Sequence, residues 1–162
     1  MRTALEHRLA LPAASHAELQ AALAALSRGE TLRSARRGEA GTLRGRTAFL
    51  FTGQGAQQPG MGAELYQAWP VFRRAMDDAF AAFDPLLARP LREVMWAAAG
   101  TADAALLHET SYTQPALFTL EWALAALWQS WGVRPELLAG HSLGELTAAC
   151  VADVFDLGEA AR

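Results

Sequence analysis

The sequence predicts an α/β fold in which a parallel sheet is covered by helices. Two short apolar runs that end at glycines, 47–52 and 137–140, are typical of buried strands. The residues between them have helical periodicity, and the order strand, helices, strand favours parallel pairing. Because only two strands are identifiable in this part of the chain, the sheet is thin for an independent α/β domain.

The first 46 residues differ from the rest and are predicted to be a linker segment that contains one helix. Residues 15–18 have a capping-box pattern, and leucines follow at helical spacing until Gly29. Residues 31–46 are polar and carry five arginines, so they are either a solvated linker or a basic patch for an acidic partner. The absence of interleaved aromatic residues favours the linker. Residues 47–162 then form the folded part.

Three features between the strands predict short helices and a loop. A helical stretch after Gly60 is interrupted by Pro70, and apolar residues continue at helical spacing to Phe83. Residues 91–96 are expected to form another helical turn, and residues 97–103 a loop.

The strongest helical signal begins at Thr113. Pro115 is placed in the first turn, leucines and tryptophans follow at helical spacing, and Gly132 ends the pattern. A last helix is predicted over 143–154, directly after the second strand.

Composition excludes several classes of function. With 52% apolar and 19% charged residues the 162-residue chain is globular, and its net charge of −3 gives no general attraction for nucleic acid or for membranes. The single Cys150 cannot form an internal disulfide, is expected to be a buried small apolar residue, and fits a reducing compartment. No apolar run reaches membrane-spanning length and no signal peptide is visible, so we expect a cytoplasmic protein. The chain has no lysine, which excludes Schiff-base chemistry, and its four histidines lack metal-ligand spacing, so no metal site is expected.

The run Gly140-His141-Ser142-Leu143-Gly144 has the G-x-S-x-G pattern of a nucleophile elbow, a sharp strand-to-helix turn that exposes a serine hydroxyl. Such a serine acts in acyl transfer or acyl hydrolysis, given a base and donors for the oxyanion. The N–H of Leu143, at a helix start, would be one donor. By itself the pattern could also be a chance glycine-rich turn.

A second glycine-rich run, Gly53-Gln54-Gly55-Ala56-Gln57, follows the first predicted strand. The carboxyl ends of parallel strands meet at one edge of the sheet, where ligands bind. Alone this run could be a flexible turn. Beside the elbow it can supply the second oxyanion donor.

Three motifs together carry a resemblance to a known family. FTGQGAQ at 51–57, TQPAL at 113–117 and GHSLGE at 140–145 stand in the order and approximate spacing of the malonyl-CoA:acyl-carrier-protein transacylases. The chain resembles most the acyltransferase domains of modular type I polyketide synthases, and the resemblance spans nearly its whole length. The segment containing LEHR resembles the end of the linker that joins a ketosynthase to the acyltransferase. The resemblance therefore implies that residues 1–46 end that linker and that residues 47–162 form the amino-terminal part of an α/β-hydrolase-like acyltransferase domain.

The resemblance also implies the roles of individual residues. Ser142 would take an acyl group from coenzyme A, the substrate, and pass it to the phosphopantetheine thiol of an acyl carrier protein, in polyketide or fatty-acid biosynthesis, with no covalently bound cofactor. Gln54 and Leu143 would be the backbone oxyanion donors. Gln114 and His141 would line the substrate pocket. Leu143, where many relatives have glutamine, resembles enzymes that select malonyl over methylmalonyl.

The chain departs from the family in what it lacks. In the family, the catalytic histidine, the arginine that binds the malonyl carboxylate and a small ferredoxin-like subdomain all follow beyond the position of Arg162. None of the chain's own histidines is placed to act as the base, and a missing base slows proton transfer by about 10²–10⁴-fold. We therefore expect a chain that is weakly active or inactive alone. The alternatives are a non-catalytic scaffold fragment that docks to a partner carrying the missing half, and a free-standing serine hydrolase.

Overall fold

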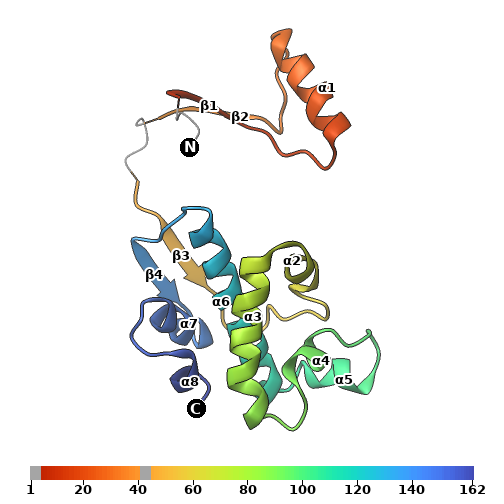
Figure 1. Cartoon of the computed structure of the whole chain (residues 1–162), viewed down its shortest axis with the longest axis vertical. Helices are drawn as coiled ribbons and strands as arrows, with labels where there is room; N and C mark the ends of the chain where they lie inside the picture. Colours follow the sequence, from red (N-terminus) through yellow and green to blue (C-terminus); the bar gives the residue numbers. More distant parts are fainter. Residues whose placement is uncertain (1–4, 41–44) are drawn as a thin grey trace. The chain divides into compact units, whose positions relative to one another are not determined.

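The computed structural model describes residues 5–40 and 45–162. The chain forms two compact units, Met1–Gly45 and Arg46–Arg162, whose secondary structure is shown in Figure 1. In the described ranges, no helix is both long enough and apolar enough to cross a membrane.

The first unit contains the predicted helix, α1, over His16–Ser27. Ser15 caps it, since its hydroxyl accepts a hydrogen bond from the Glu18 N–H at 3.1 Å. The carboxylate of Glu18 accepts from the Ala14 N–H at 2.8 Å instead of from the Ser15 N–H. The second hydrogen bond of the capping box is thus donated by the residue before the cap and not by the cap itself.

Two strands in this unit were not predicted. β1, His7–Ala10, pairs antiparallel with β2, Arg36–Glu39. Residues 31–46, expected to be a solvated linker, therefore contain a strand whose residues are all exposed. Every residue of both strands is exposed, so neither carries the apolar alternation by which a strand is identified in sequence.

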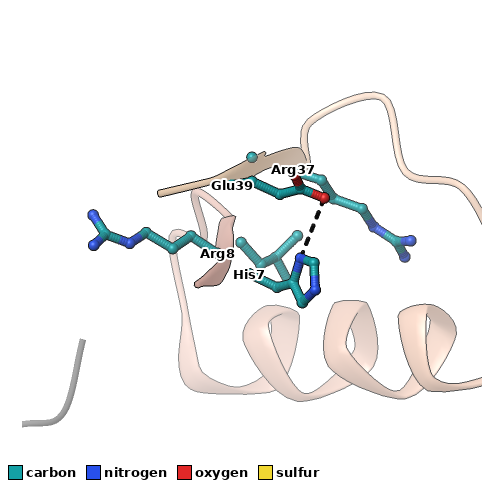
Figure 2. A pocket seen from close by; sticks show the side chains of 6 residues that line it. His7, Arg8, Arg37 and Glu39 are labelled. Atoms are coloured by element: carbon teal, nitrogen blue, oxygen red, sulfur yellow. Dashed lines mark ion pairs between the residues drawn. The ribbon is translucent and has the colours of Figure 1, made fainter. Parts of the chain in front are cut away.

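A shallow groove runs over this two-stranded sheet (Figure 2). His7 Nδ1 lies 3.5 Å from Glu39 Oε1 across the two strands, and the guanidinium groups of Arg8 and Arg37 point away from this pair on either side. The His7 and Glu39 side chains are 80% and 54% exposed, so the pair contributes little to stability.

The second unit contains both predicted strands. β3, Ala48–Phe51, and β4, Leu137–Gly140, are paired in parallel with Ala48 opposite Leu137 and Phe51 opposite Gly140 (Figure 1). The helices of this unit are α2 Ala63–Ala68, α3 Pro70–Phe83, α4 Leu91–Met95, α5 Ala102–Leu106, α6 Thr110–Ser130, α7 Leu143–Val151 and α8 Leu157–Ala160, with a 3₁₀ turn, η1, at Asp84–Leu86.

Helix boundaries differ from the predicted ones at three places. The predicted loop over 97–103 is confirmed for 97–101, and its last two residues belong to α5, which is capped by the Thr101 hydroxyl. Helix α6 starts at Thr110, so Pro115 lies inside the helix and not in its first turn. Helix α7 ends at Val151 and not at 154, because Asp153 has a φ of 57° and the Val154 N–H donates back to the Ala149 carbonyl at 3.0 Å.

The main core lies between α3 and α6. Phe83 and Phe118 meet edge to face with ring centroids 5.5 Å apart, and Phe72 and Met76 are fully buried. Helix α7 packs on both strands and on α6. On the strands themselves burial is uneven, since Phe51 is buried whereas Leu50 is 78% exposed.

Candidate functional site

The predicted strand-turn-helix is present at Ser142. Strand β4 ends at Gly140, α7 begins at Leu143, and the serine between them has φ 54° and ψ −117°. A positive φ is strained for a residue with a Cβ and typically costs about 1–3 kcal/mol. The turn is closed by the Glu145 N–H, which donates to the Ser142 carbonyl at 3.0 Å. The serine is left exposed at the start of a helix.

Glycines at both ends of the elbow allow this close approach. A Cβ on Gly140 would collide with the backbone of Gly144 and Glu145. A Cβ on Gly144 would collide with the Phe51 carbonyl and lie 2.7 Å from the Thr52 carbonyl oxygen. Helix α7 therefore starts directly against the end of β3.

The GQGAQ loop lies beside the serine, as the shared sheet edge predicts. The His141 N–H donates to the Phe51 carbonyl at 3.2 Å, which joins the two strand ends. A Cβ on Gly53 would lie 2.8 Å from His141 Nδ1 and 3.4 Å from Ser142 Cβ. Among the hydrogen bonds of the described residues, none uses the N–H of Gln54 or of Leu143, so both donors remain available for a ligand.

Gln114 and Leu143 line one groove of about 410 Å³, formed by α3, η1, α6, α7 and α8. Gln114 is exposed on α6, and the lining is mostly apolar, with Phe83 and Phe118 at its floor. Arg162 also lines this groove.

A general base for Ser142 is not evident in the parts of the chain that are described. No hydrogen bond there joins a histidine to the Ser142 hydroxyl. His141 is exposed beside Gly53, and His108 Nδ1 lies 3.5 Å from the Gln57 side-chain amide.

Cys150 is buried in α7, as predicted, with 2% of its surface exposed. Burial, with the nearby carboxylates of Asp153 and Asp156, raises the pKa of its thiol to about 11. It is therefore not a nucleophile near neutral pH. Over residues 5–40 and 45–162, no three His, Cys, Asp or Glu side chains cluster as metal ligands would.

Glu121 was missed by sequence reasoning. Its side chain, 9% exposed in the middle of α6, accepts hydrogen bonds from the Thr52 N–H at 2.6 Å and from the Thr52 hydroxyl at 2.8 Å. Its second oxygen accepts from the Thr147 hydroxyl of α7 at 3.0 Å. The only signal in the sequence is an acidic residue within an otherwise apolar helix.

Several known proteins are similar to this chain in sequence and in fold. The profile of the acyl transferase domain family matches residues 48–162. The chain is 47% identical over 159 residues to the polyketide synthase GfsA of Streptomyces halstedii, covering 98% of this chain and 2% of that protein.

Two solved structures extend the comparison. The acyltransferase domain from the second module of the salinomycin polyketide synthase is 48% identical, with a TM-score of 0.83 over 97% of this chain and 35% of that one. A malonyl-transacylase solved in complex with its type II polyketide synthase acyl-carrier protein is 36% identical, with a TM-score of 0.61 over 73% of this chain and 36% of that one. The chain thus spans about a third of the solved relatives. It belongs to the acyl transferase domain family and is similar to the acyltransferase domains of modular type I polyketide synthases.

Proposed function

We propose that this chain presents the nucleophile and the oxyanion donors for transfer of an acyl group from coenzyme A to the phosphopantetheine thiol of an acyl carrier protein. The observation that carries this proposal is the exposed Ser142, held at φ 54° at a helix start beside the Gly53 loop. A strained serine persists only where its surroundings enforce it, and reactive residues are where such strain is found.

The first half of the reaction acylates the serine. Ser142 Oγ forms a bond to the thioester carbonyl carbon while its proton passes to a base. The N–H groups of Gln54 and Leu143 stabilise the resulting oxyanion. Collapse of the intermediate breaks the carbon–sulfur bond, and coenzyme A leaves as its thiol.

In the second half the carrier-protein thiol attacks the serine ester through the same oxyanion site. The ester bond breaks, and Ser142 regains its proton as a hydroxyl. A solved relative that is a malonyl-transacylase bound to an acyl-carrier protein supports the choice of this partner.

We propose malonyl as the acyl group. Leu143 at the position after the serine and the malonyl-transacylase relative support this choice. Gln114 and His141 are proposed to contact the substrate from α6 and from the elbow. Both side chains are exposed, and Gln114 shares its groove with Leu143.

The base and the carboxylate-binding arginine are proposed to come from residues outside this sequence. A second groove, of about 370 Å³, is lined by all of β3 and by Leu124, Trp128 and Val133. Leu50 and Trp128 are 78% and 47% exposed. Because the chain spans about a third of its solved relatives, we propose that further residues of an acyltransferase domain cover this apolar face. Residues 1–46 are proposed to be the end of a linker from a ketosynthase-type domain.

The reaction is tested by incubating the chain with malonyl-CoA and following its intact mass. Enzymes turn over at about 10 s⁻¹ and loss of the base removes about 10²–10⁴-fold, so acylation at about 10⁻³–10⁻¹ s⁻¹ is expected. Added imidazole, which substitutes for the missing base, should raise this rate in proportion to its concentration.

Two variants decide where the acyl group goes. S142A should take up no mass, whereas S130A, which removes an exposed serine at the end of α6 and outside the groove of Gln114, should behave as the wild type. Acylation that survives in S142A would refute the proposal.

The uncovered face of β3 favours a second candidate function, a scaffold fragment without catalysis. It would bind the remainder of an acyltransferase domain yet show no acylation even with imidazole. Rapid hydrolysis of a small ester with no transfer to carrier protein would instead support the serine hydrolase.

A further inference from the structure

The buried carboxylate of Glu121 contacts the two segments that carry the proposed oxyanion donors, Gln54 and Leu143. Thr52 directly follows β3 and stands two residues before Gln54, whereas Thr147 lies on the helix that begins at Leu143. Glu121 accepts from both threonines at once, at 2.6, 2.8 and 3.0 Å. A single side chain of α6 therefore holds the loop and the helix together.

The chemistry of this contact requires two acceptor oxygens. A buried carboxylate is unfavourable unless its oxygens accept hydrogen bonds. Here neutral donors satisfy it, and in the described part of the chain no arginine or histidine forms an ion pair with Glu121. A carboxylate accepts at both oxygens, and a hydrogen bond to an ionised acceptor is shorter and stronger than a neutral one.

The Thr52 backbone is fixed on two sides as a result. Its N–H is held by Glu121, while its carbonyl oxygen lies so close to Gly144 that a Cβ there would be 2.7 Å away. The peptide after it leads through Gly53, which abuts His141 and Ser142. A shift of Thr52 would therefore carry the Gln54 N–H away from the serine.

We propose that Glu121 is a positioning residue of the acyl-transfer site, which sets the separation between the Gln54 N–H and the Leu143 N–H. This rests on the proposed function. Glu121 does not touch the substrate, and its effect falls on the oxyanion and not on acyl-CoA binding. Misplacing a catalytic group by about 1 Å can slow a reaction about 10²-fold.

The first measurement is single-turnover acylation by malonyl-CoA, followed by intact mass over a range of concentrations. E121A should lower the rate constant about 100-fold and change the half-saturating concentration by less than about twofold. E121Q, which keeps an acceptor for Thr52 and offers an amide to Thr147, should recover to within about 10-fold of the wild type. E136A, at an exposed glutamate, is the matched control.

Thr147 provides a milder test in case E121A does not fold. T147V preserves the shape of the side chain and removes the hydroxyl, and it should slow acylation about 10-fold. T147S, which restores a hydroxyl, should return the rate to near the wild-type value. If Thr147 were only structural, T147V would lower the free energy of unfolding, but the acylation rate constant of each folded molecule would stay at the wild-type value.

Amide hydrogen exchange at Thr52, whose N–H donates to Glu121, tests the contact without any activity. Exchange should quicken in E121A and stay slow in E121Q and E136A. Unchanged exchange in E121A, or wild-type acylation rates in folded E121A and T147V, overturns the proposal. A wild-type chain that takes up no acyl group even with imidazole contradicts the proposed function instead, and exchange then decides the role of Glu121 in holding Thr52.

Discussion

Replacing Gly144 by alanine tests how closely α7 must approach β3. A Cβ at this position would lie 2.7 Å from the Thr52 carbonyl oxygen, and the Phe51 carbonyl is nearer still. Since non-bonded contacts are optimal near 3.5 Å, helix and strand must separate by more than about 0.8 Å. Both obstacles are backbone atoms, so no side chain can rotate out of the way.

The separation has a calculable effect on the free energy of unfolding. Overpacking of this kind costs about 1–3 kcal/mol. The hydrogen bond from the His141 N–H to Phe51, already 3.2 Å long, would also weaken, at a cost of about 1 kcal/mol. Alanine recovers up to about 1 kcal/mol through its better helix propensity. We therefore expect G144A to lose about 1–3 kcal/mol.

Gly158 offers a matched control, because it is also the second residue of a helix, α8. A Cβ there would meet only the Asp156 carboxylate oxygen at 3.3 Å, the end of a side chain. Its replacement by alanine should leave the free energy of unfolding unchanged or raise it by up to about 1 kcal/mol. Urea unfolding followed by tryptophan fluorescence measures both variants. Equal stability of G144A and G158A would refute the close approach of α7 to β3.

Three further predictions concern a helix end, a thiol and an oxyanion donor. Asp153 occupies a left-handed position where glycine is favoured, so D153G should raise the free energy of unfolding by about 1 kcal/mol in urea unfolding. Cys150 has a thiol pKa raised to about 11, so the folded chain keeps the proton that the unfolded chain releases. Stability should therefore be unaffected below about pH 8.5 and should fall as pH rises toward 11, whereas C150A should show a shallower fall. Gln54 is proposed to act through its N–H, so Q54A should acylate within about threefold of the wild type and Q54P about 10²–10³-fold more slowly; equal rates would contradict that role.

The parts of the fold that could be predicted are those with a local signal. Strands β3 and β4 are short apolar runs that end at glycines, and the elbow is set by glycines on either side of Ser142. The proximity of Gly53 to Ser142 followed from one rule, that carboxyl ends of parallel strands share an edge. Strands β1 and β2 could not be found in this way, since all their residues are exposed and neither HRLA nor RRGE alternates apolar with polar residues.

Glu121 and Pro115 show two further limits of prediction from sequence. Sequence alone suggests that a glutamate on a helix lies at the surface, and only the placement of β3 and α7 around α6 buries it. Pro115 is favoured in a first turn, yet α6 extends N-terminally to Thr110, where the Glu109 carbonyl accepts from the Tyr112 and Thr113 N–H groups. For Glu121 long-range contacts override the local preference, whereas the extra turn ahead of Pro115 is closed by local hydrogen bonds.

The backbone strain at Ser142 shows which contacts of this chain keep the site in place. A φ of 54° costs about 1–3 kcal/mol, and something in the chain must offset it. The surrounding contacts all lie within residues 47–162: the β3–β4 pairing, the glycine contacts of α7 with β3, and the hydrogen bonds of Glu121 to Thr52 and Thr147. None of them depends on a base or on a bound acyl group. The proposed nucleophile and the segments that carry its proposed oxyanion donors are thus held together by the chain itself, so a base supplied from elsewhere would need only to reach the Ser142 hydroxyl and not to build the site around it.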